Sequence, residues 1–156
     1  MNQLYVLWAS ARSPELLTAA QQKSVLAALH SLQQRDGGWA LSLLDQGNRP
    51  QDSSWRRIRK QLKIAVKPPE SDGCATGLVV LVLEEIGTSR QDPMLVHGLQ
   101  WLEGHQGSDG SWRAESLNAK RDPQTDVGRF MSDAAIGYAV MALEEARQQQ
   151  RDAAHL

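Results

Sequence analysis

Four side chains of this 156-residue chain have types that could support chemistry, and they stand where two apolar helices are predicted to begin: Asp72, Cys74, Thr76 and Asp133. A carboxylate at a helix N-terminus can hold a proton or a cation, and the free backbone N–H groups there attract anions. The starts of these helices are therefore the candidate ligand site. The same Asp residues are also typical N-caps, whose side chains bond only backbone N–H groups. The sequence leaves both interpretations open.

The two helices that carry these residues are predicted to be buried on all sides. Ser71-Asp72 begins a helix to Glu85, which Gly87 ends. Ser132-Asp133 begins a last helix through Glu145. The centres of both helices are apolar all round, which is typical of helices buried on both faces. The helices also resemble each other, with Gly77 and Gly137 at related positions.

The sequence also predicts two helices that bury only one face, one before each of these helices. Thr18 and Gln21 fit a capping box for a helix that runs to about Gln34. Asp92-Pro93 begins another helix with a single apolar stripe. A short apolar helix over residues 4–11 precedes them. The order is therefore buried, one-sided, buried, one-sided, buried.

Each one-sided helix is followed by a copy of the same pattern, Q-x-x-D-G-x-W. Asp-Gly predicts a turn, because glycine tolerates positive φ and aspartate bonds nearby backbone. The Trp anchors the turn in the core, and the Gln can bond backbone groups at a neighbouring helix end. The motif therefore indicates a structural turn that sets the angle between successive helices. Its residues are Gln33, Asp36, Gly37 and Trp39 in the first copy, and Gln106, Asp109, Gly110 and Trp112 in the second.

This motif resembles the QW repeat of squalene–hopene and oxidosqualene cyclases, and related repeats occur in protein prenyltransferase β subunits. The second copy is the fuller one, since Gly98, Trp101 and Leu102 precede it as in the family's G-x-x-W-L stretch. The first copy has Val25, Ala28 and Leu29 there. The resemblance covers about residues 4–147. It implies one domain, 1–156, with repeat one at about 15–45 and repeat two at about 91–117.

The predicted fold is all-α, an α/α toroid in which inner and outer helices alternate. Both the helix order and the resemblance indicate it. A closed toroid of the resembled family has about six inner helices, whereas the pattern here predicts three inner and two outer ones. The chain is thus expected to form a partial ring of about five main helices. Either it is a portion of a longer polypeptide, or two chains associate across the exposed flank.

The sequence matches the catalytic motifs of the resembled families only in part. Class II terpene cyclases protonate their substrate with an Asp-x-Asp-Asp motif, and the sequence contains none. Asp72-Gly73-Cys74 resembles the Asp-x-Cys zinc pair of prenyltransferase β subunits, but the later inner helix has no His to complete the set. The four histidines are at positions 30, 97, 105 and 155. We therefore expect no metal and no other cofactor, and the chain by itself is not expected to be catalytic.

Two hypotheses for function remain. In the first, the chain is a binding or scaffold portion of a larger toroid protein. Its partner would be an apolar or isoprenoid-like ligand, a second copy, or the continuation of the parent chain. In the second, it is the C-terminal segment of a squalene–hopene-type cyclase whose catalytic acid lies upstream. A polar loop from Ser116 to Asp133, with Arg121 and Arg129, could meet an anionic ligand or form internal ion pairs.

The composition argues against several classes of partner and site but indicates no function. The net charge of −1 gives no general attraction to nucleic acid, and no apolar run approaches transmembrane length. The single cysteine excludes an internal disulfide. The basic stretch from Arg56 to Lys63 could meet an acidic partner or be a solvated loop. The chain would be cytoplasmic if Met1 is its natural start, and the localisation is otherwise open.

Overall fold

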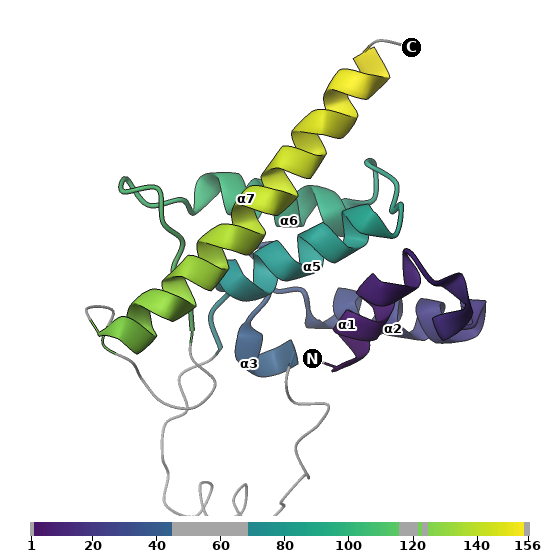
Figure 1. Cartoon of the computed structure of the whole chain (residues 1–156), viewed down its shortest axis with the longest axis horizontal. Helices are drawn as coiled ribbons and strands as arrows, with labels where there is room; N and C mark the ends of the chain where they lie inside the picture. The colour runs from purple at the N-terminus through teal and green to yellow at the C-terminus, as the bar shows by residue number, and fades with distance from the viewer. Residues whose placement is uncertain (1, 45–68, 116–121, 123–124, 155–156) are drawn as a thin grey trace, which may run out of the picture.

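The computed structural model describes residues 2–44, 69–115, 122 and 125–154 (Figure 1). Its elements in chain order are α1 (Asn2–Ser10), the 3₁₀ helix η1 (Pro14–Leu16), α2 (Ala19–Leu32), α3 (Leu41–Leu44), α5 (Gly73–Glu85), α6 (Pro93–Gly104) and α7 (Asp126–Ala154). The described ranges contain no strand, which confirms the all-α prediction for them. The basic stretch from Arg56 to Lys63 lies outside the described residues.

Helix α5 is the centre of the structure. Twelve of its thirteen residues are buried, as its apolar sequence predicts. Helix α7 crosses α5 on one side and α6 lies behind it, while α1 also contacts α5 and α2 packs against α1 (Figure 1). Helices α1, α5 and α7 thus form an inner set, and α2 and α6 an outer one. This alternation is the predicted partial α/α toroid of five main helices.

The predicted helix starts of α2, α5 and α6 are confirmed by their caps. Thr18 and Gln21 form the complete capping box at α2. The carboxylate of Asp72 accepts from the Ala75 backbone N–H at the start of α5, and Asp92 caps α6. These signals are local, since each cap needs only residues within one helical turn.

The predicted start of the last helix was wrong. Helix α7 begins at Asp126 rather than at Ser132, and it continues to Ala154 rather than ending at Glu145. The Thr125 hydroxyl oxygen accepts from the Gly128 backbone N–H at 3.2 Å and caps the helix there. The Ser132 hydroxyl instead donates to the Gly128 carbonyl one turn earlier, as serine does inside a helix.

Two further expectations change with this boundary. Residues 128–131, which were expected to belong to a loop, are helical, and Asp133 is an exposed residue within α7 rather than a cap. Helix α7 is also not buried all round. One stripe of small residues faces the core, while Val140 and Met141 are exposed at 45% and 46%. The buried stripe consists of Ala135, Ala139, Ala142 and Ala146.

The crossing of α5 and α7 depends on one glycine. A Cβ atom at Gly77 would lie 2.7 Å from the backbone nitrogen of Ala139, so only glycine permits this approach. The related Gly137 lies on α7 with nothing within 4 Å of its Cβ position. The similarity of the two helices in sequence therefore does not extend to the packing of these glycines.

Candidate functional site

The first clasp, residues 33–39, is a tight turn after α2. Gln33 Nε2 donates to the Gly37 carbonyl at 2.9 Å, and the Trp39 indole Nε1 donates to the Leu29 carbonyl at 2.9 Å. Trp39 is completely buried. Gly37 has φ of 91°, a conformation that favours glycine. The motif thus ends α2 and packs the Trp39 side chain against the last turns of that helix.

The second clasp, residues 106–112, repeats this geometry after α6. Gln106 Nε2 donates to the Gly110 carbonyl at 3.1 Å, and the Trp112 indole donates to the Leu102 carbonyl at 2.8 Å. Gly110 has φ of 83°. Each of these contacts joins the residues that correspond in the two copies of the motif, so the sequence repeat is also a structural repeat.

The first clasp also binds neighbouring helices. Gln33 Nε2 donates to the Met94 carbonyl in the first turn of α6 at 2.9 Å, and the Trp101 indole donates to Asp36 Oδ2 at 3.1 Å. The Ser71 hydroxyl donates to Asp36 Oδ1 at 2.8 Å. Burial alone would raise the pKa of Asp36, but these hydrogen bonds, led by that from Ser71, lower it below its ordinary value. The first clasp therefore joins α2, α6 and the start of α5.

Two of the predicted site residues, Asp72 and Thr76, lie beside this junction. Asp72 accepts from the Leu41 backbone N–H at 2.7 Å as well as from Ala75 at 2.9 Å, so both carboxylate oxygens are occupied. Thr76 Oγ1 accepts from the Trp39 backbone N–H at 3.0 Å. Burial raises the pKa of Asp72 to about 6. Both side chains thus hold the segment after the first clasp, as the N-cap interpretation allows, and their binding of a ligand stays a prediction.

The other two predicted site residues, Cys74 and Asp133, do not share these hydrogen-bond partners. Cys74 is buried, and its burial followed by the charge of Asp72 raises the pKa of the thiol to about 11, so it stays protonated at neutral pH. Asp133 lies on the exposed surface of α7. Among the described residues, no group of three His, Cys, Asp or Glu side chains is placed to hold a metal ion.

A groove that the sequence did not reveal lies between α1, α5 and α7, with a volume of about 530 Å³. Arg12 and Glu85 form an ion pair in it at 3.7 Å. Its other lining residues are Trp8, Leu81, Met141, Glu144, Glu145 and Gln148. No local pattern could have revealed the groove, because its residues come from three helices.

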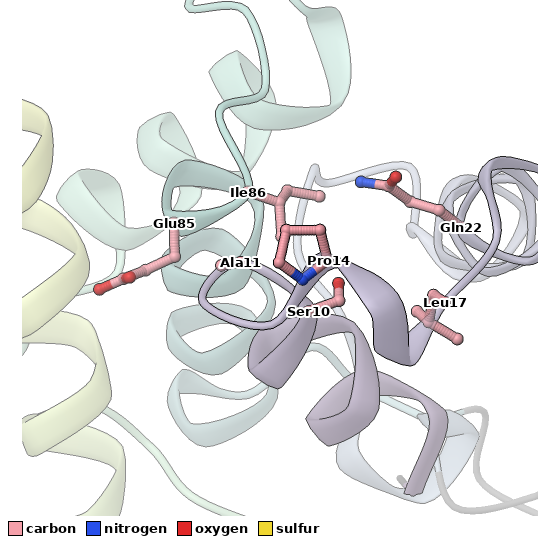
Figure 2. A pocket seen from close by; sticks show the side chains of 7 residues that line it. All are labelled: Ser10, Ala11, Pro14, Leu17, Gln22, Glu85 and Ile86. Carbon is pink, nitrogen blue, oxygen red and sulfur yellow. The ribbon is translucent and has the colours of Figure 1, made fainter.

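A smaller cavity of about 220 Å³ lies where the end of α1, η1, the start of α2 and the end of α5 meet. Figure 2 shows Pro14 and Ile86 side by side there, with Glu85 at one edge and Gln22 at the other. The mixed lining and open shape of this cavity define no chemistry.

Two clasps that tie outer helices to a buried inner layer define a QW-repeat α/α-toroid protein. The sequence model of the squalene-hopene cyclase C-terminal domain matches residues 73–156, more than half of the chain, and the chain belongs to this family. No curated protein and no solved structure matches the chain. It is a squalene cyclase-like repeat domain without the Asp-x-Asp-Asp motif. None of its described helices is long and apolar enough to span a membrane.

Helix α5 also buries a carboxyl group that no sequence motif indicates. Glu84 is 4% exposed, and its Oε2 has no hydrogen-bond partner among the described residues. Burial, followed by the carboxylate of Glu145, raises its pKa to about 8, although Arg90 opposes the shift. The carboxyl group is therefore largely protonated in the folded protein at neutral pH.

Replacing Glu84 by Gln is expected to flatten the pH dependence of stability. In the unfolded chain the carboxyl ionises near its ordinary value of 4.5, whereas in the folded chain it keeps its proton until about pH 8. Stability is thus lost as pH rises through this window, by at most about 1.4 kcal/mol per pH unit for one group. Urea unfolding at pH 5 and pH 8 measures the loss, which Glu84→Gln should reduce. Exposed Glu144→Gln is the control, and equal pH dependence in both variants would contradict the prediction.

Proposed function

We propose that this chain is a non-catalytic scaffold module that binds another helical surface through the outer face of α7. The observation that carries the proposal is the set of exposed apolar side chains on α7, outside its buried alanine stripe. Phe130 is 68% exposed, and Val127 is 47% exposed one turn earlier. Val140 and Met141, further along the same helix, are also exposed. Water-exposed apolar side chains in this number on one helix are typical of an interaction surface.

The polar groups of the inner layer support a structural role rather than a catalytic one. Both oxygens of Asp72 and the hydroxyl of Thr76 accept from backbone N–H groups of the chain. A catalytic acid must reach its substrate with a free proton-bearing atom. These side chains offer none, so they stabilise the junction of α5 with the first clasp.

A protein partner is better supported than an isoprenoid-like ligand. The groove between α1, α5 and α7 is lined by the carboxylates of Glu85, Glu144 and Glu145. An apolar ligand there would remove water from charged groups without replacing their hydrogen bonds, which is unfavourable. Arg129 and Asp133 beside Phe130 are exposed, so in an interface on α7 their charges can stay hydrated at its edge while the apolar side chains are buried, and a second copy of the chain is the partner that we propose.

Light scattering on a size-exclusion column tests this proposal. The wild-type chain is expected to elute with a mass of at least twice 17.3 kDa, because burial of the α7 face favours association. Phe130→Ser with Val140→Ser should return it to the monomer mass. The control is Leu16→Ser, which removes an apolar side chain of 49% exposure from η1. A wild-type monomer at every concentration, or equal effects of both variants, would reject the α7 interface.

A further inference from the structure

The groove between α1, α5 and α7 combines apolar side chains with carboxylates. Its volume of about 530 Å³ lies in the range of small-molecule sites. Each of the three helices supplies one apolar side chain, and these are Trp8, Leu81 and Met141. The carboxylates are those of Glu85 on α5 and of Glu144 and Glu145 on α7. A ligand that fits this groove must therefore be apolar along part of its length and must also meet negative charge.

The cations beside the groove neutralise only part of this charge. Of the described residues that line the groove, only Arg12 is a cation. It pairs with Glu85 at 3.7 Å, and 83% of its side chain is exposed, so water weakens this pair. Glu144 pairs with Arg147 at 2.7 Å, and both side chains are more than half exposed. The groove therefore keeps a net negative charge.

The carboxylate of Glu145 contributes most directly to this charge. Its Oε1 accepts from Gln149 Nε2 at 3.0 Å, which is a neutral donor, and it forms no ion pair with a described cation. The negative potential also acts on the neighbouring buried carboxyl group of Glu84. Burial is the largest cause of the raised pKa of Glu84, and the charges of Glu145 and Glu85 add to it, although Arg90 opposes them. A positive charge brought to this end of α5 is therefore attracted.

The spacing of the carboxylates favours an extended organic cation over a metal ion. Among the described residues, no three His, Cys, Asp or Glu side chains are placed to hold a metal ion. Calcium and magnesium need several oxygen atoms around one centre. An ammonium group needs only one carboxylate and can keep water on its remaining N–H groups. Several ammonium groups on one chain can thus meet carboxylates that stand apart.

We propose that this groove binds an aliphatic polyamine, whose ammonium groups pair with the groove's carboxylates and whose methylene chain packs on its apolar side chains. Charge complementarity selects this ligand class. An anion would be repelled, and a neutral apolar ligand would remove water from the carboxylates without replacing it. The polyamine avoids this cost, because each ammonium group replaces the lost water at a carboxylate. The site is separate from the α7 interface, since neither Phe130 nor Val140 lines the groove.

Isothermal titration calorimetry of the full chain with octamethylenediamine tests the ligand class. The diamine is expected to bind, and added salt should weaken its binding because the attraction is between charges. Octamethylene glycol, which has the same chain without the charges, should not bind. Tetramethylenediamine has the same two charges on a shorter chain, so it should bind more weakly because it buries fewer methylene groups. Absence of diamine binding, or equal binding of the diamine and the glycol, would overturn the proposal.

A charge-matched pair of double variants identifies the groove. Glu85→Gln with Glu145→Gln keeps the shape of both side chains and is expected to weaken binding of the diamine about fivefold or more. The control is Glu15→Gln with Glu103→Gln, which removes two exposed carboxylates of η1 and α6. Equal weakening by both double variants would show that the diamine follows overall charge and would overturn the groove site.

The α7 interface and the groove fail separately. Phe130→Ser with Val140→Ser leaves every residue that lines the groove in place, so this variant should bind the diamine as the wild type does. Loss of self-association with retained diamine binding supports both proposals. Retained self-association without diamine binding would reject the groove site alone.

Discussion

Gly77→Ala is expected to loosen the packing of α7 on α5 and to lower the free energy of unfolding by about 1–3 kcal/mol. The added methyl would meet backbone atoms of α7, the nearest being the Ala139 nitrogen at 2.7 Å. Unlike a flexible side chain, backbone atoms cannot rotate away from the added methyl, so the whole of α7 must shift. This loss appears despite the higher helix propensity of alanine, which alone would add about 1 kcal/mol.

Gly137→Ala is the matched control for this prediction. It places the same methyl on α7 at a position with nothing within 4 Å, so it should stabilise the chain by about 0.5–1 kcal/mol. Urea unfolding followed by circular dichroism measures both variants. Stabilisation by Gly77→Ala of the same size as by Gly137→Ala would show that the α5–α7 crossing is not as close as described.

Trp39→Ala is expected to cost about 3–5 kcal/mol, the largest effect among the single substitutions considered for the first clasp. The side chain is completely buried, and its indole supplies a hydrogen bond to the Leu29 carbonyl. Removal leaves a cavity next to Gly98 of α6, whose Cβ position lies 3.0 Å from the Trp39 ring. The variant should therefore loosen α2 and α6 together.

Trp39→Phe separates the two contributions. It keeps most of the apolar contact but removes the indole hydrogen bond to the Leu29 carbonyl, which still accepts from the Gln33 backbone N–H at 3.1 Å. We therefore expect a loss of about 0.5–1.5 kcal/mol, smaller than for Trp39→Ala. Thermal unfolding by differential scanning calorimetry measures both. Equal losses for the two variants would mean that the hydrogen bond, and not the packing of the ring, dominates this anchor.

Local features of this protein follow from short stretches of its sequence. The capping box of Thr18 and Gln21 and the Asp72 cap each depend on residues within one turn, so their patterns predict them directly. The burial of α5 follows from a helix that is apolar on all sides. The repeated Q-x-x-D-G-x-W motif likewise predicts two turns of the same kind.

The start of α7 has two competing signals in the sequence. Ser132-Asp133 matches the pattern of a cap, and the apolar run after it favours that interpretation. Thr125, which follows Pro123 in the sequence, is the signal that prevails, although it lies before a stretch without strong apolar periodicity. Since a Ser hydroxyl can also bond the carbonyl one turn earlier, a cap-like pair is compatible with a helix interior.

The packing of the helices decides which of two similar residues makes a contact between helices. Gly77 and Gly137 look alike in sequence, yet only Gly77 lies against another backbone. Asp36 and Asp109 occupy the same motif position, yet only Asp36 receives an indole from α6. The physical reason is that these contacts join segments far apart in the chain, and their partners exist only after the helices have packed.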